Sequence, residues 1–85
     1  MKQFTYTITD AEGIHARPAG LLVKTAAAFA SDIKVVKDGN AANAKKIFAV
    51  MGLAAKKGET VTVTVEGSDE AKAFETLQSF FKANL

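Results

Sequence analysis

The stretch that decides the fold is DIKVVKDGNAAN, residues 32–43. Residues 32–38 predict a strand, and they run into Asp38-Gly39, a pair typical of the two-residue turn of a β-hairpin. The short segment NAAN, residues 40–43, then predicts a second strand. Because two strands joined by such a turn are antiparallel, the hairpin argues against an all-parallel sheet.

Two further segments alternate apolar and polar residues with the period of a strand. FTYTIT, residues 4–9, places Phe4, Tyr6 and Ile8 on one face and threonines on the other. TVTVTVE, residues 60–66, does the same with three valines. Strands with one apolar and one polar face are typical of an antiparallel sheet that is covered on one side.

Apolar residues at helical spacing predict three helices, over residues 16–30, over residues 46–53 and after Ser68. Ser68 can cap the last helix, and the acidic residues after it favour a helix start. The apolar stripe of the first helix consists of Ala19, Leu22, Val23, Ala26 and Phe29, and that of the last consists of Ala73, Phe74, Leu77, Phe80 and Phe81.

The resulting order of elements, β-α-β-β-α-β-α, predicts an α+β fold in which one antiparallel sheet carries its helices on one face. With 85 residues, the chain has room for one modest core. We therefore expect a single domain over residues 1–85.

The composition excludes several functions. With no cysteine and one histidine, neither a thiol nucleophile nor a metal site is expected, and no cofactor motif is present. The net charge of +2 is too small to indicate nucleic-acid binding. No apolar run approaches the roughly 20 residues that cross a bilayer, and the first residues do not resemble a secretion signal. We expect a cytoplasmic monomer with no cofactor, no nucleic-acid partner and no direct membrane contact.

The segment EGIHARPAG, residues 12–20, holds the only histidine and the only proline of the chain. Pro18 suits the first turn of a helix, where its missing N–H would have no partner, so His15 falls at or beside the N-cap. Unpaired N–H groups there bind anions such as phosphate, and Arg17 adds a charged fork that matches phosphate oxygens. An imidazole in this place can attack a phosphoryl group and hold it as a phosphoramidate.

The residues alone also allow His15 to be an ordinary surface or capping residue. They offer no second general base and no glycine-rich nucleotide loop, so a phosphoryl carrier fits them better than a self-sufficient enzyme.

The stretch GIHARPAG, residues 13–20, resembles the active-site signature of the HPr family, the histidine-containing phosphocarrier proteins of the bacterial phosphotransferase system. The resemblance extends over the whole chain in length, element order and hairpin position. KKIFAVMGL, residues 45–53, is similar to the second helix of the Gram-positive branch. The resemblance implies an open-faced sandwich, with a four-stranded antiparallel sheet and three helices on one face.

The same resemblance implies a reaction and its residues. Enzyme I, charged by phosphoenolpyruvate, would phosphorylate His15 at Nδ1, and the phosphoryl group would pass on to sugar-specific enzyme IIA domains. Arg17 would clamp the phosphate, Ala16 and Arg17 would supply backbone N–H groups, and Pro18 would fix the transition from loop to helix.

A carrier that meets several partners needs a small, transient docking surface. We expect this docking surface on the first two helices, at Ala16, Gly20, Lys24, Ala27, Ile47, Phe48 and Met51. The residues alone allow Phe48 and Met51 to complete the core instead, and the family resemblance favours docking. Lys24, Lys45 and Lys46 would attract acidic partners, although such lysines are usually only solvated.

Two positions depart from the family pattern. Gram-positive members have a regulatory serine at the start of the second helix, where this chain has Lys46. We therefore expect no regulatory phosphoserine and none of the repression that depends on it; the positive charge of lysine cannot mimic phosphoserine. Glu12 replaces a small polar residue, and its carboxylate would repel a phosphoryl group on His15 if it came close.

Three other functions remain open from the sequence. A regulatory phosphorelay paralogue would use the same His15 chemistry without sugar transport. A non-catalytic allosteric effector is a binding module of another class, and the presence of His15 counts against it. A small nucleic-acid-binding domain would place aromatic residues on the open sheet face, where both clear strands carry threonines.

Overall fold

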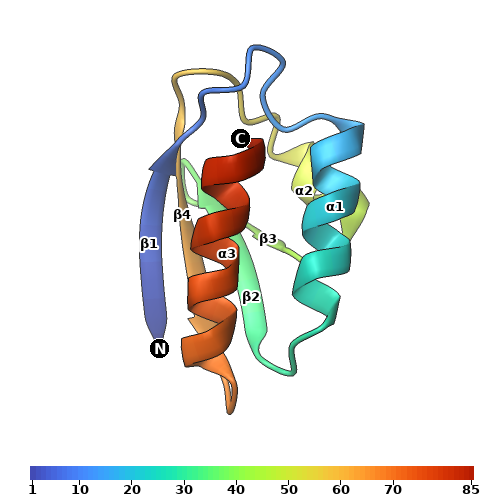
Figure 1. Cartoon of the computed structure of the whole chain (residues 1–85). Coiled ribbons are helices and arrows are strands. Elements are labelled where there is room, and N and C mark those ends of the chain that lie inside the picture. Colours follow the sequence, from blue (N-terminus) through green and yellow to red (C-terminus); the bar gives the residue numbers. More distant parts are fainter.

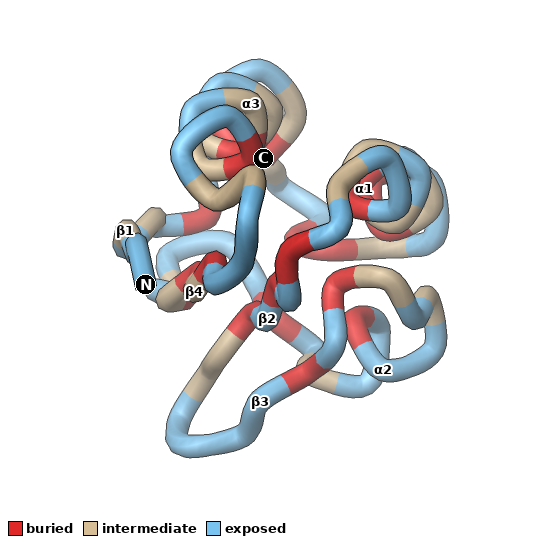
Figure 2. The backbone as a smooth tube through the Cα atoms, turned by 90° about the horizontal axis from the view of Figure 1, so that it is seen from below, coloured by how far each residue is buried: buried red, intermediate tan, exposed pale blue.

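The computed structural model describes residues 1–85 and contains four strands and three helices (Figure 1). The strands form one sheet in the order β1-β4-β2-β3, with each neighbouring pair antiparallel. The helices cover one face of this sheet (Figures 1 and 2), which confirms the predicted α+β fold and its βαββαβα order. The elements are β1 (Lys2–Thr7), α1 (Ala16–Ala27), β2 (Asp32–Lys37), β3 (Asn40–Asn43), α2 (Ile47–Gly52), β4 (Thr60–Glu66) and α3 (Glu70–Asn84).

The β2–β3 hairpin turns where the sequence predicts it. Asp38 and Gly39 have φ angles of 49° and 80°, as the first and second turn residues of a type I′ turn require. They join Lys37 to Asn40, which face each other as the last pair of the ladder. Glycine adopts this conformation without strain, and aspartate tolerates it better than most residues. The turn therefore has one defined geometry, and that geometry fixes the register of both strands.

Strand β4 supplies buried residues to the sheet side of the core. Val61, Val63 and Val65 are fully buried under the helices, whereas Thr62 and Thr64 are only half-buried. Each fully buried aliphatic side chain contributes about 1.5–3 kcal/mol relative to an exposed one. The other side of the core is supplied by the predicted helical stripes, of which the buried members are Ala19, Leu22 and Ala26 in α1 and Ala73, Leu77 and Phe81 in α3.

Aromatic contacts hold β1 against α3. The ring of Phe81 meets those of Phe4 and Tyr6 edge to face, with centroids 5.6 and 5.5 Å apart. Such pairs add about 0.5–1.5 kcal/mol to the burial of their area. Just beyond, the backbone oxygen of Leu85 accepts the N–H groups of Thr9 and Asp10. The end of α3 therefore lies beside the loop that leads to His15.

Some boundaries differ from the predictions. β1 spans residues 2–7 rather than 4–9, because Thr9 and Asp10 pair with Leu85 instead of continuing the ladder. α1 ends at Ala27 rather than Ala30, because the N–H groups of Ala28 and Phe29 bond three residues back and tighten the last turn. α2 spans Ile47–Gly52, one residue shorter at each end than predicted.

Ser68 does not cap α3, contrary to the prediction. It is exposed, and the N-cap is Asp69, whose side chain makes no capping bond. The Asp69 carboxylate instead accepts the backbone N–H groups of Ala30 and Ser31, at 2.9 and 3.0 Å, and the Ser31 hydroxyl. These bonds lower the pKa of the Asp69 carboxyl, and the bond from the Ser31 hydroxyl has the largest effect. Asp69 therefore ties the start of α3 to the connection between α1 and β2.

Candidate functional site

His15 is the N-cap of α1. Its backbone is extended, with φ −107° and ψ −174°, and its oxygen accepts the Ala19 N–H at 2.9 Å. The imidazole makes no capping bond and is 36% exposed. The ring is therefore accessible at the positive end of the helix, in the place where the sequence predicts it.

The turn before His15 rests on the loop that follows α2. The Ile14 N–H donates to the Ala55 oxygen at 2.9 Å. Gly13 has φ 68°, and a Cβ there would lie 2.2 Å from the same oxygen. Only glycine fits this close approach of two backbones, which fixes His15 relative to the loop.

Two carboxylates face one nitrogen of the imidazole. The His15 Nε2 atom lies 3.5 Å from Glu12 Oε2 and 3.9 Å from Asp10 Oδ1. The Asp10 oxygen is itself held by the Glu12 N–H at 2.8 Å. Negative charge on this side of the ring favours a proton on Nε2, which leaves the lone pair on Nδ1.

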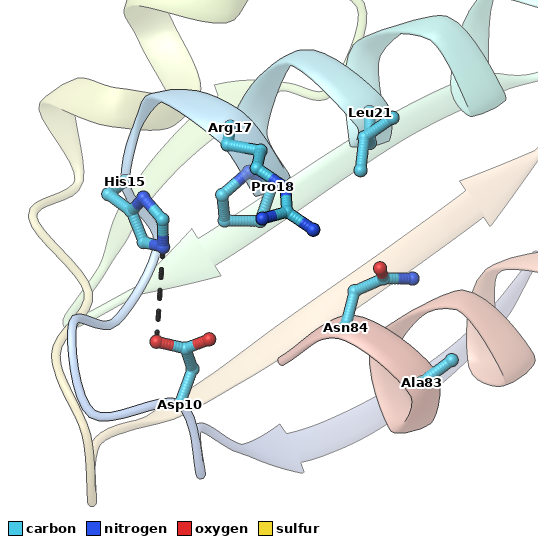
Figure 3. A pocket seen from close by; sticks show the side chains of 7 residues that line it. All are labelled: Asp10, His15, Arg17, Pro18, Leu21, Ala83 and Asn84. Atoms are coloured by element: carbon cyan, nitrogen blue, oxygen red, sulfur yellow. Dashed lines mark ion pairs between the residues drawn. The ribbon is translucent and has the colours of Figure 1, made fainter.

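His15 opens onto a hollow of about 240 Å³ (Figure 3). Arg17 and Pro18 of α1 lie on one side of it, and Ala83 and Asn84 of α3 lie on the other (Figure 3). Pro18 is buried in the first turn, as expected, whereas Arg17 is exposed and takes part in none of the four ion pairs of the structure. The guanidinium is therefore free to bind an anion beside the open end of α1.

Four residues that line the hollow were missed from the sequence: Asp10, Leu21, Ala83 and Asn84. Asp10 could have been noticed, because it lies in the turn before His15 and carries a charge. The two residues of α3 come from the other end of the chain, and the packing of α3 on β1, together with the contact of Leu85 with Thr9 and Asp10, brings them here.

The apolar residues expected to dock partners differ in exposure. Phe48 is 85% exposed and Met51 36%, whereas Ile47 is half-buried and packs against the core. Gly20 lies beside Ile47, since a Cβ on it would stand 3.8 Å from the Ile47 side chain. Leu21, which the sequence did not single out, is 41% exposed and lines the hollow. The other α1 positions proposed for docking, Ala16, Lys24 and Ala27, are exposed.

The three lysines are not equivalent. Lys45 Nζ donates to the Phe29 oxygen at 2.7 Å, so its ammonium binds the end of the α1 segment. Lys24 and Lys46 are exposed, and Lys46 is the N-cap of α2. Long-range attraction of an acidic partner would therefore come mainly from Lys24, Lys46 and Arg17.

A phosphate-sized anion in the hollow would meet the Arg17 guanidinium and the free N–H groups of the first turn of α1, with the imidazole at its edge. This is the chemistry of a phosphoryl carrier, which takes a phosphoryl group from one protein and gives it to another.

Comparison with known proteins identifies which carrier. The family described as "PTS HPr component phosphorylation site" matches residues 2–83. The phosphocarrier protein HPr of Lysinibacillus sphaericus is 53% identical over 77 residues, which cover 91% of this chain and 88% of that protein. The chain belongs to the HPr family and is a phosphocarrier of the phosphotransferase system; enzyme I and enzyme IIA are the partners that this membership implies.

Solved structures agree with this assignment. An HPr from Thermoanaerobacter tengcongensis superposes with a TM-score of 0.92 at 41% identity, over 98% of this chain and 93% of that one. An HPr from Bacillus anthracis superposes with a TM-score of 0.87 at 40% identity, over 94% and 95% of the two chains. In this chain, none of the three helices has the length and apolar character required to span a bilayer.

Proposed function

We propose that His15 is the phosphoryl acceptor and that its Nδ1 atom makes the bond. The observation that carries this proposal is the position of Asp10 and Glu12, both on the Nε2 side of the ring. A proton held on Nε2 leaves Nδ1 as the nucleophile at the start of α1.

Phosphorylated enzyme I is the only co-reactant that the transfer needs. The Nδ1 lone pair attacks phosphorus, the bond from phosphorus to the phosphorylated enzyme I breaks, and its electron pair stays with enzyme I. Arg17 and the N–H groups of Ala16 and Arg17 bind the phosphoryl oxygens, while Pro18 sets the geometry of this first turn. Transfer to enzyme IIA is a second displacement of the same kind: a nucleophile of enzyme IIA attacks phosphorus, the bond from phosphorus to Nδ1 breaks, and its electron pair returns to Nδ1 of His15.

The docking surface of the proposal consists of Ala16, Gly20, Lys24, Ala27, Ile47, Phe48 and Met51. Its main support is Phe48, because an aromatic side chain with 85% exposure makes little contribution to the core. Phe48 and Met51 supply adaptable apolar contacts, and the lysines attract acidic partners.

Three further points belong to the proposal. Lys46 at the start of α2 leaves no serine there, so the regulatory phosphorylation of Gram-positive relatives is absent. The carrier works in the cytoplasm, where its family takes phosphoryl groups from enzyme I. It works as a monomer, although an HPr of Thermoanaerobacter tengcongensis forms a dimer; sedimentation of the purified chain tests this point.

The proposal is tested by incubating the purified protein with phosphoenolpyruvate and a Gram-positive enzyme I and measuring its intact mass. We expect one acid-labile phosphoryl adduct, which is absent in His15→Ala. An adduct that persists in His15→Ala would contradict the assignment of His15. No adduct in either protein would mean that the chain answers to a different enzyme I or that it is an allosteric effector. An adduct that no enzyme IIA accepts would favour a regulatory phosphorelay.

A further inference from the structure

Lys37, at the end of β2, has a side chain that is unusually well buried for a lysine. Its side chain is 14% exposed, although lysine is normally among the most exposed residues. Nζ lies 3.1 Å from Glu59 Oε1, 3.1 Å from the Leu53 oxygen and 3.2 Å from the Ala54 oxygen. The three donors of the ammonium therefore have three acceptors.

These acceptors close the segment between α2 and β4. Leu53 and Ala54 follow α2 directly, and Ala54 is held at φ 52°, where alanine is uncommon. Glu59 Oε1 also accepts the Lys56 N–H at 2.7 Å. The pKa of the Glu59 carboxyl is lowered, most of all by this bond from the Lys56 backbone and next by the bond from the Lys37 ammonium. One ammonium and one carboxylate thus fix both ends of residues 53–59.

This segment is the one on which the turn before His15 rests. Ala55, next to Ala54, accepts the Ile14 N–H, and its oxygen faces the bare Cα of Gly13. A displacement of Ala54 would be passed through the Ala55 oxygen to Ile14, and from there to the adjacent His15.

We propose that Lys37, together with Glu59, positions His15 for phosphoryl transfer by clamping the loop that supports the Gly13–Ile14 turn. Lys37 does not touch the phosphoryl group; it acts through Ala54 and Ala55. The proposal rests on His15 as the phosphoryl acceptor. A nucleophile displaced by a fraction of an ångström loses rate, because misplacement by about 1 Å can cost about 100-fold.

The test compares Lys37→Met, which keeps an unbranched apolar chain of similar length and removes the ammonium, with Lys34→Met as a matched control. Lys34 lies on the same strand, is exposed and takes part in no ion pair. Glu59→Gln removes one charge of the clamp and keeps the two backbone acceptors of Lys37, so it serves as the milder second variant.

Two readouts are needed. The first is hydrogen exchange and the ¹H–¹⁵N shift of the Ile14 amide in the unphosphorylated protein. The second is the steady-state rate of phosphoryl acceptance from enzyme I, separated into kcat and KM. We expect Lys37→Met to accelerate Ile14 exchange and to lower kcat about five- to tenfold with KM nearly unchanged, because the nucleophile moves and the exposed docking side chains do not. Glu59→Gln should give a smaller change in the same direction, and Lys34→Met none.

The result that would overturn the proposal is a Lys37→Met protein with a lower Tm but an unchanged Ile14 amide and an unchanged kcat. If Lys37→Met does not fold, Glu59→Gln decides by the same two readouts. If the wild type accepts no phosphoryl group, the assignment of His15 has failed, and the Ile14 amide still shows whether the clamp holds the turn.

Discussion

The carboxylate of Glu12 lies 3.5 Å from Nε2 of His15, on the side of the ring away from the nitrogen that takes the phosphoryl group in our proposal. This negative charge repels the negatively charged phosphoryl oxygens across the ring, which destabilises the phosphohistidine.

The first prediction concerns the lifetime of the phosphorylated protein. Glu12→Ser should slow its hydrolysis by up to about fivefold, since removing one exposed charge changes a free energy by about 0.2–1 kcal/mol. The decay is followed by intact mass or by ³¹P NMR at neutral pH. Glu66→Ser, at the far end of β4, is the control and should leave the rate unchanged. Equal rates for wild type and Glu12→Ser would show that Glu12 points to solvent and has no effect.

The second prediction concerns Arg17. Arg17→Ala should lower kcat/KM for acceptance from enzyme I by about 10- to 150-fold, the equivalent of one hydrogen bond to a charged group, about 1.5–3 kcal/mol. Arg17→Lys should fall between, because lysine keeps the charge without the planar fork. The Tm should stay within about 2 °C of the wild type, since an exposed residue without an ion pair contributes little to stability. Full activity in Arg17→Ala would remove Arg17 from the site.

The third prediction separates docking from folding at Phe48. Phe48→Ala should raise KM for enzyme I about tenfold with little change in kcat, as expected of an aromatic anchor in a small interface. Its free energy of unfolding should change by less than about 0.5 kcal/mol, because the side chain is on the surface. Phe80→Ala, whose ring packs on the core, should lose much more stability. An unchanged KM in Phe48→Ala would place the docking surface elsewhere.

The fourth prediction concerns stability in acid. The pKa of Asp69 in the folded protein is below its ordinary value of 3.8, chiefly because of the bond from the Ser31 hydroxyl. A carboxyl with a lowered folded pKa stabilises the fold above its unfolded pKa, and this contribution is lost as the pH falls through the folded value. Glu59 and Glu70 act in the same direction.

The free energy of unfolding should therefore fall as the pH is lowered from about 5 to about 2. Asp69→Asn should be less stable than the wild type at neutral pH, and the difference between them should shrink in acid. Urea titrations at several pH values measure both. A constant difference would mean that the charge of Asp69 does not act through the Ala30–Ser31 backbone.

Much of the fold was predictable because its signals are local. Asp38-Gly39 specifies its own turn, and the alternation in β4 specifies which face is buried, whatever the rest of the chain does. The position of His15 at a helix start followed from Pro18 in the same way. These features depend on residues within one or two turns of each other.

The wrong predictions and the missed residues lie where segments that are far apart in the sequence contact each other. Ser68 looks like a cap, yet nothing in the sequence shows that Asp69 finds the Ala30 and Ser31 backbone almost 40 residues earlier. The contribution of Asn84 to the hollow depends on where α3 ends against β1. Lys45 was expected to be a surface charge and Lys37 was not singled out, because only the tertiary structure brings carbonyl oxygens to them.

The most direct test of the central claim is to determine which ring nitrogen of His15 carries the phosphoryl group. Long-range ¹H–¹⁵N correlation of the ¹⁵N-labelled protein, phosphorylated with phosphoenolpyruvate and enzyme I, assigns the phosphoryl group to one ring nitrogen. We expect it on Nδ1, with Nε2 protonated and facing Asp10 and Glu12. A phosphoryl group on Nε2, or on any other residue, would contradict the account.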